Sequence, residues 1–107
     1  MRKVAVPIGR LHCKDGASLS VQANDTAYCN PRMSFADHYS EVEVGFIENA
    51  TLPDTWLEYA DDGTIDSDVF AYVPVALVEE FIQAHGGIDL GKTLAIICKR
   101  APYVEIP

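Results

Sequence analysis

Lysine and arginine are missing from the middle of this sequence. All eight of them lie in residues 2–32 and 92–100, whereas thirteen Asp and Glu residues lie between Met33 and Gly91. The formal net charge is −8. Proteins bind nucleic-acid phosphates mainly through Lys and Arg, which displace counterions. We therefore expect the central stretch to repel nucleic acid and to attract a basic partner protein.

Other absences exclude further classes of protein. No run of eighteen apolar residues is present, and the apolar stretch at the N-terminus is broken by proline, glycine and arginine. We therefore expect neither a membrane span nor a signal peptide. The three cysteines, Cys13, Cys29 and Cys98, form no CxxC pair. An odd number of unpaired cysteines favours a reduced, cytoplasmic protein.

The length and composition favour one folded unit. The chain has 107 residues, of which 49% are hydrophobic and 22% charged. That length is close to the common size of one domain, and the apolar content is sufficient for a core. We expect a single globular domain over residues 1–107.

Hydrophobic periodicity predicts the secondary structure. Apolar residues alternate or run together in five segments, as strands require, at residues 2–9, 17–23, 40–47, 68–73 and 93–100. The last two are apolar on both faces and are expected to be central strands. Residues 51–60 predict a short helical segment with Trp56, Leu57 and Tyr59 turned inward.

The clearest helix is predicted at residues 74–85. Its apolar residues recur at helical spacing, Pro74 suits a helix start, and Gly86 suits a C-cap. The order of elements favours an α+β fold, a mostly antiparallel sheet of four to five strands with this helix packed on one face.

The strand at residues 40–47 carries the first part of an acidic site. Val42, Val44 and Phe46 are predicted to share its buried face, with Glu41 and Glu43 on the other. Two such carboxylates lie about 6.8 Å apart, and phosphates of one DNA strand advance by about 3.4 Å, so the pair can imitate every second phosphate.

Six further carboxylates extend this predicted partner-binding site if the loop folds back beside the sheet: Asp54, Glu58, Asp61, Asp62, Asp66 and Asp68. The plain alternative is that these residues only keep the protein soluble. The lack of any Lys or Arg between Met33 and Gly91 favours recognition of a basic partner.

Metal sites are weak alternatives in this sequence. The stretch DDGTIDSD is rich in oxygen ligands but does not match the EF-hand pattern. His12, Cys13, Cys29 and His38 offer zinc ligands at irregular spacing, and whether they bind metal stays open. We expect no cofactor.

Catalytic motifs are weaker still. Cys29 and either His38 or His85 have the residue types of a nucleophile and its base, but no other feature of such a site accompanies them. No phosphate-binding glycine loop is present. His85 is better explained by the dipole at the helix C-terminus. We expect a protein that is not an enzyme.

Several stretches resemble small acidic proteins encoded by bacteriophages and prophages: LSVQANDTAYCNPR, YSEVEVGFI and LEYADDGTIDSDVFAYVPVALVEEFIQAHGG. The resemblance covers roughly residues 18 to 86. It implies an inhibitor of host defence in the cytoplasm of a bacterial cell, with anti-CRISPR proteins as one such class. It names no target and transfers no functional residue.

Two hypotheses for function follow. In the first, a phage-derived inhibitor binds a basic host protein or nucleoprotein complex of the CRISPR type through a phosphate-mimicking surface, without binding nucleic acid or membrane itself. In the second, the protein is a small assembly module that forms a homodimer through a sheet edge or an aromatic patch around Trp56 and Tyr59.

Overall fold

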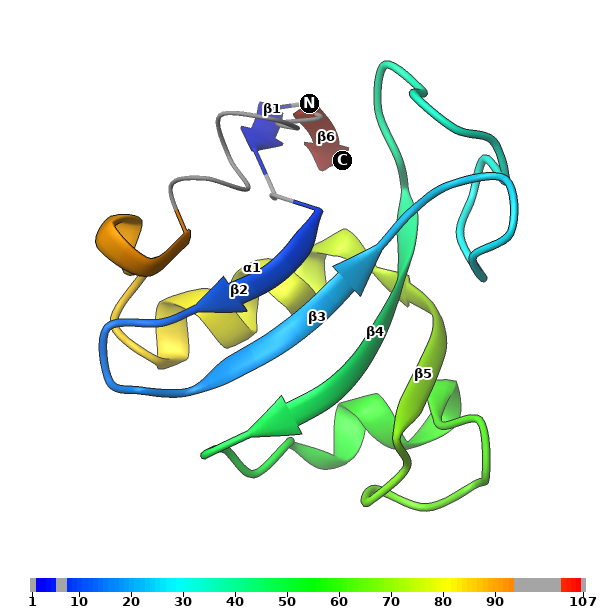
Figure 1. The fold of residues 1–107 in the computed structure, drawn as a ribbon. Helices are drawn as coiled ribbons and strands as arrows, with labels where there is room; N and C mark the ends of the chain where they lie inside the picture. The colour runs from blue at the N-terminus through cyan, green and yellow to red at the C-terminus, as the bar shows by residue number, and fades with distance from the viewer. Residues whose placement is uncertain (1, 6–7, 94–102, 107) are drawn as a thin grey trace.

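The computed structural model describes residues 2–5, 8–93 and 103–106, with side-chain surroundings for residues 8–93 (Figure 1). The elements in chain order are β1 (Arg2–Ala5), β2 (Gly9–His12), β3 (Ser18–Gln22), β4 (Glu41–Glu48), the 3-10 helix η1 (Asp54–Tyr59), β5 (Val69–Pro74), α1 (Val75–Ala84) and β6 (Tyr103–Ile106). Over these described ranges, none of the helices has both the length and the apolar character needed to cross a bilayer.

The main sheet has four antiparallel strands in the order β2-β3-β4-β5. Helix α1 lies across one face of this sheet, behind the strands in Figure 1. Strands β1 and β6 pair with each other in a separate antiparallel sheet. The predicted α+β fold, an antiparallel sheet with one helix packed on it, is confirmed.

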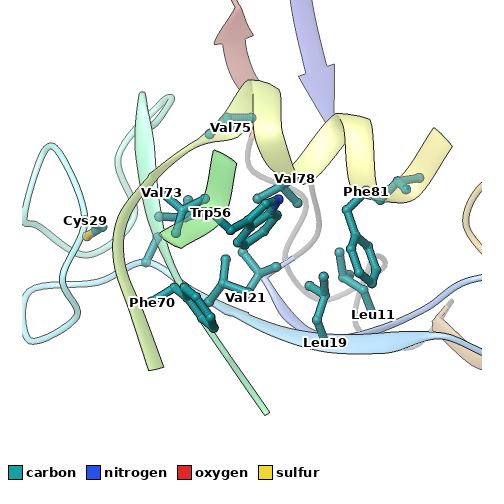
Figure 2. Close-up of a cluster of buried hydrophobic side chains, with 14 of the residues drawn as sticks. Leu11, Leu19, Val21, Cys29, Trp56, Phe70, Val73, Val75, Val78 and Phe81 are labelled. Atoms are coloured by element: carbon teal, nitrogen blue, oxygen red, sulfur yellow. The ribbon is translucent and has the colours of Figure 1, made fainter. Parts of the chain in front are cut away.

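The core lies between α1 and the covered face of the sheet, where Leu11, Leu19 and Val21 meet Val78 and Phe81 of the helix (Figure 2). These five side chains are buried because β3 presents every second residue to the helix and α1 presents a stripe at helical spacing.

The predicted bounds of the helix are correct to one residue at each end. The helix begins at Val75 after Pro74 and ends at Ala84, with His85 as its C-cap. Gly86 follows with φ +87, the left-handed conformation expected of a residue that terminates a helix.

The prediction of a strand over residues 2–9 is confirmed for residues 2–5, which form β1, and residues 6–7 lie outside the described residues. Strand β1 ends at Ala5, and the chain joins the main sheet only at β2, which begins at Gly9. Gly9 has φ +126, which turns the backbone in a way that a residue with a Cβ rarely adopts. The last predicted strand, at residues 93–100, falls outside the described residues except for Thr93, which belongs to a helical turn.

Strand β4 departs from simple alternation at Phe46. Ser18 of β3 pairs with Glu48 and Ser20 pairs with Gly45, so β4 holds one extra residue in a bulge. Phe46 has φ +49, and its side chain is 60% exposed. The prediction that Phe46 shares the buried face is therefore wrong.

Strand β5 is an edge strand, and the prediction of a central position is also wrong. Its outer edge faces the chain that follows η1, where Ala60 forms a bridge with Phe70 and the Asp61 N–H donates to the Val69 carbonyl at 2.9 Å. This local cover protects part of the β5 edge from pairing with another chain.

Candidate partner-binding site

The acidic residues after β4 begin on η1. Trp56 is buried, with its ring centroid 5.8 Å from that of Phe70 and 6.3 Å from that of Phe81 (Figure 2). This anchor leaves Asp54 and Glu58 exposed on the outer side of the turn. Of the neighbouring residues predicted to turn inward, Leu57 is 44% exposed, so that part of the prediction is wrong.

Residues 61–68 form an ordered loop between η1 and β5. The Asp62 carboxylate accepts hydrogen bonds from the Thr64 backbone N–H at 2.9 Å and the Thr64 hydroxyl at 2.8 Å. These bonds stabilise the ionised carboxylate and lower the pKa of Asp62 below its ordinary value. Ser67 is buried and its hydroxyl donates to the Val69 carbonyl at 2.8 Å. The carboxylates are thus carried by a backbone with a defined conformation.

The end of this loop is fixed against β4. The Phe46 N–H donates to the Asp68 carbonyl at 3.0 Å. Asp61, Asp62, Asp66 and Asp68 are all exposed. Together with Asp54 and Glu58 they form what we call the acidic segment, six exposed carboxylic residues within residues 54–68.

Glu41 lies near Tyr59, the last residue of η1. Burial raises the pKa of the Tyr59 hydroxyl, and the Glu58 and Glu41 carboxylates raise it further. Glu41 is half-buried at the start of β4, so it contributes to the field of the segment more than to its exposed surface.

Glu43 belongs to a different neighbourhood. Its carboxylate accepts the Tyr28 N–H at 3.1 Å, and it lies opposite Gln22 on the sheet face away from α1. The Tyr28 ring packs beside Tyr72, and the Arg32 guanidinium lies 5.5 Å from the Tyr28 ring centroid. Glu43 thus serves the packing of the loop over residues 23–40, and the regular spacing predicted for Glu41 and Glu43 does not make them an equivalent pair.

The fold brings a basic residue, Arg10, to the acidic strand β4. Arg10 of β2 reaches β4, where its guanidinium lies 3.3 Å from Glu48 Oε1 and donates to the Phe46 carbonyl oxygen and the Ser18 hydroxyl. Within residues 8–93, none of the eight predicted site residues is ion-paired with Lys or Arg.

The sequence analysis missed the contact between Asp15 and His85. Asp15, in the turn between β2 and β3, has its Oδ2 2.6 Å from His85 Nδ1 at the end of α1. The Ala17 N–H and His85 hold the pKa of Asp15 below its ordinary value. A sequence separation of 70 residues gives no local signal for such a pair.

Two of the candidate metal and catalytic residues, Cys13 and Cys29, are buried free cysteines. Across residues 8–93 no group of three or more His, Cys, Asp or Glu side chains is placed to hold a metal ion. The buried Cys29 thiol lies 3.2 Å from the Asn24 carbonyl oxygen and 3.3 Å from that of Pro31. Burial raises the pKa of Cys13, which disfavours a thiolate there.

An exposed apolar tip is the other surface feature. Phe35 is 82% exposed and Met33 49% exposed, at the end of the loop over residues 23–40. The buried Tyr39 supports this tip, because its hydroxyl donates to the Met33 carbonyl at 2.8 Å and accepts the Ala36 N–H at 3.2 Å.

Comparisons with protein-family models, with curated proteins and with solved structures find no match for this chain.

Proposed function

We propose that this protein binds a basic partner protein through the acidic segment and Glu41, and that it occupies a groove rich in Lys and Arg that otherwise holds nucleic-acid phosphates. The observation that supports this function best is the set of six exposed carboxylic residues on one ordered stretch, residues 54–68. Glu43 adds to the negative field from the neighbouring sheet face.

Order before binding favours this mode of recognition. Hydrogen bonds from Thr64, Ser67 and Phe46 already fix the loop backbone, so association orders fewer groups. A dense negative surface accelerates encounter with a positive one, and this acceleration falls as salt screens the charges. The protein acts by occlusion and needs no chemistry of its own.

The resemblance to small phage proteins supplies the class of partner. A nucleic-acid-binding protein of bacterial defence, of the CRISPR type, presents the kind of basic channel that such a surface fits. In this function the protein is a phage-derived inhibitor in the bacterial cytoplasm.

Capture of a partner tests this function. The tagged protein is incubated with lysate of a bacterial host that expresses CRISPR effector complexes, then washed at low and at high salt. We expect a nucleic-acid-binding protein that is retained at low salt, released at high salt, and displaced by added double-stranded DNA. A retained partner that is indifferent to DNA would contradict phosphate mimicry.

A second candidate is an assembly module. Of the aromatic patch predicted around Trp56 and Tyr59, Trp56 is not available, because it is 1% exposed, and Tyr59 is half-buried. The exposed tip at Met33 and Phe35 is the feature that favours self-association instead. A dimer held by this tip resists high salt and is lost in Phe35→Ser, as sedimentation analysis would report.

A further inference from the structure

A cleft of about 200 Å³, with both polar and apolar lining residues, opens where β4 ends and the loop over residues 61–68 returns to the sheet. One wall comes from the end of β4 and the chain after it, and the other from the end of the loop. Its lining residues are Phe46, Ile47, Ala50, Thr51, Leu52, Ile65, Asp66, Ser67 and Asp68.

Apolar side chains form one part of this lining. Leu52 is nearly buried, and Ile47 and Ile65 are half-buried. Phe46 joins them because the β4 bulge moves its side chain away from the core, to 60% exposure. An exposed aromatic ring beside aliphatic side chains offers a surface that an apolar group of a ligand can cover.

The polar groups of the cleft divide into two kinds. The Ser67 hydroxyl is already engaged, since it donates to the Val69 carbonyl and accepts the Asp62 N–H. Asp66 and Asp68 are exposed residues of the lining, so two carboxylic residues that solvent reaches border the cleft. Among residues 8–93, no side chain forms an ion pair with either of them.

Arg10 is a basic residue near the cleft, and its guanidinium is engaged by other groups. The Arg10 guanidinium donates to the backbone carbonyl oxygen of Phe46. Its charge is balanced by Glu48, whose Oε1 lies 3.3 Å from Arg10 Nη2. Arg10 is not part of the lining. Among the described residues, the lining thus combines apolar side chains with two carboxylic residues and contains no Lys or Arg.

We propose that this cleft receives one lysine or arginine side chain of the basic partner protein. The aliphatic stem packs against Phe46, Leu52 and Ile65, and the cationic head reaches Asp66 and Asp68, since such side chains bury their stems and keep the charge at the surface. A volume of about 200 Å³ is below the roughly 300–1,000 Å³ typical of small-molecule sites, and it suits a single side chain. This inference depends on the proposed function for the presence of a basic partner.

Peptides whose cationic side chains differ in length distinguish binding in the cleft from general attraction to the negative surface. The acetylated and amidated peptides Gly-Gly-X-Gly-Gly are titrated into ¹⁵N-labelled protein at low salt, with X as lysine, diaminobutyrate or norleucine. Diaminobutyrate keeps the charge but lacks two methylenes, and norleucine keeps a stem without charge. We expect lysine to bind about tenfold more tightly than diaminobutyrate, with norleucine weakest. Shifts should concentrate at residues 46–52 and 65–68.

Matched variants assign the preference to the cleft. Phe46→Ala removes an apolar wall without changing charge, and should abolish the preference for lysine over diaminobutyrate. Ile65→Thr is a second wall variant if Phe46→Ala fails to fold. Asp66→Asn with Asp68→Asn should reduce binding of both cationic peptides. Asp54→Asn with Glu58→Gln removes the same charge outside the lining and should keep the preference.

The outcomes separate this inference from the proposed function. Equal affinity for the lysine and diaminobutyrate peptides, or shifts spread evenly over residues 54–68, would contradict side-chain binding in the cleft. Neither result would contradict partner binding by the acidic segment. Absence of peptide binding at millimolar concentration also overturns the cleft. The acidic-surface function is decided separately, by capture of a partner that salt and DNA release.

Discussion

Gly45 of β4 lies very close to the Asp68 backbone carbonyl oxygen. A Cβ at residue 45 would be only 2.9 Å from that oxygen, so a residue without a side chain is needed there. The same carbonyl accepts the Phe46 N–H at 3.0 Å. This close approach of β4 to the acidic loop fixes both the last carboxylate of the acidic segment and one wall of the cleft. The absence of a side chain at one position in β4 thus helps to place the proposed binding surface.

Gly45→Ala should destabilise the protein by about 1–3 kcal/mol, because its new methyl group meets backbone that cannot rotate away. Urea unfolding followed by the fluorescence of the single tryptophan measures this change. Gly91→Ala is the control, since its nearest neighbour is a side-chain oxygen of Asp89 at 3.3 Å. Equal stability of the two variants would show that the Asp68 carbonyl oxygen leaves room for a methyl group at residue 45.

Trp56→Ala should cost about 3–5 kcal/mol, because it empties a buried site between Phe70 and Phe81. Circular dichroism during urea unfolding measures the loss, as the variant has no tryptophan. Leu57→Ala, at a neighbouring residue that is 44% exposed, is the matched control and should cost much less. A small effect of Trp56→Ala would mean that η1 is not anchored by this ring.

The contact between Asp15 and His85 should make stability depend on acid pH. The pKa of Asp15 is lowered in the fold by the Ala17 N–H and by His85, so folding favours the carboxylate. This contribution is complete above the ordinary pKa of an aspartate, about 3.9, and is lost as pH falls through the lower folded value. Asp15→Asn should therefore differ most from the wild type near neutral pH.

Urea unfolding of both proteins between pH 7 and pH 3 measures this difference. The Asn side chain still offers an oxygen to the Ala17 N–H, so the comparison reports the loss of the charge and of the Oδ2 acceptor that faces His85. A difference that grows as the pH falls would contradict the assignment.

Arg10→Ala should destabilise the protein by about 1–2 kcal/mol, because its guanidinium donates to the Phe46 carbonyl and the Ser18 hydroxyl. Glu48→Gln should cost less than about 1 kcal/mol, since Glu48 is 68% exposed and this ion pair is weak. A double-mutant cycle compares the two. A larger effect of Glu48→Gln would mean that the ion pair, and not the bonds to β3 and β4, holds Arg10.

The regular parts of the fold were predictable because they follow local periodicity. Val78, Phe81 and Ile82 indicated the helix, and Gly86 indicated its end, to within one residue. Alternation predicted β3 and the first half of β4. The bulge at Phe46 was not predictable, since a φ of +49 at an aromatic residue is imposed by pairing with neighbouring strands. Sequence analysis therefore placed Phe46 in the core, although it lies at the surface.

The acidic site was predictable in composition but not in arrangement. Charge counting identified the exposed carboxylic residues of the acidic segment, because nothing in the sequence nearby neutralises them. It could not show three contacts of acidic side chains: Glu43 with the Tyr28 N–H, Asp62 with the Thr64 N–H, and Asp15 with His85. These contacts depend on the conformation of loops and on how segments distant in sequence pack together. The cleft also arises only from the β4 bulge and the returning loop.

The most direct test of the acidic surface compares two variants with equal charge. Asp61, Asp62, Asp66 and Asp68 are changed together to Asn in one variant, and in the control Asp25, Asp37 and Asp89 are changed to Asn and Glu80 to Gln. The measurement is the amount of the captured basic partner that each retains at low salt, relative to the wild type. We predict a loss of at least about tenfold for the first variant and little change for the control, because only the first removes carboxylates of the acidic segment. Equal retention by both variants would contradict the account, since net charge and not this surface would then govern binding.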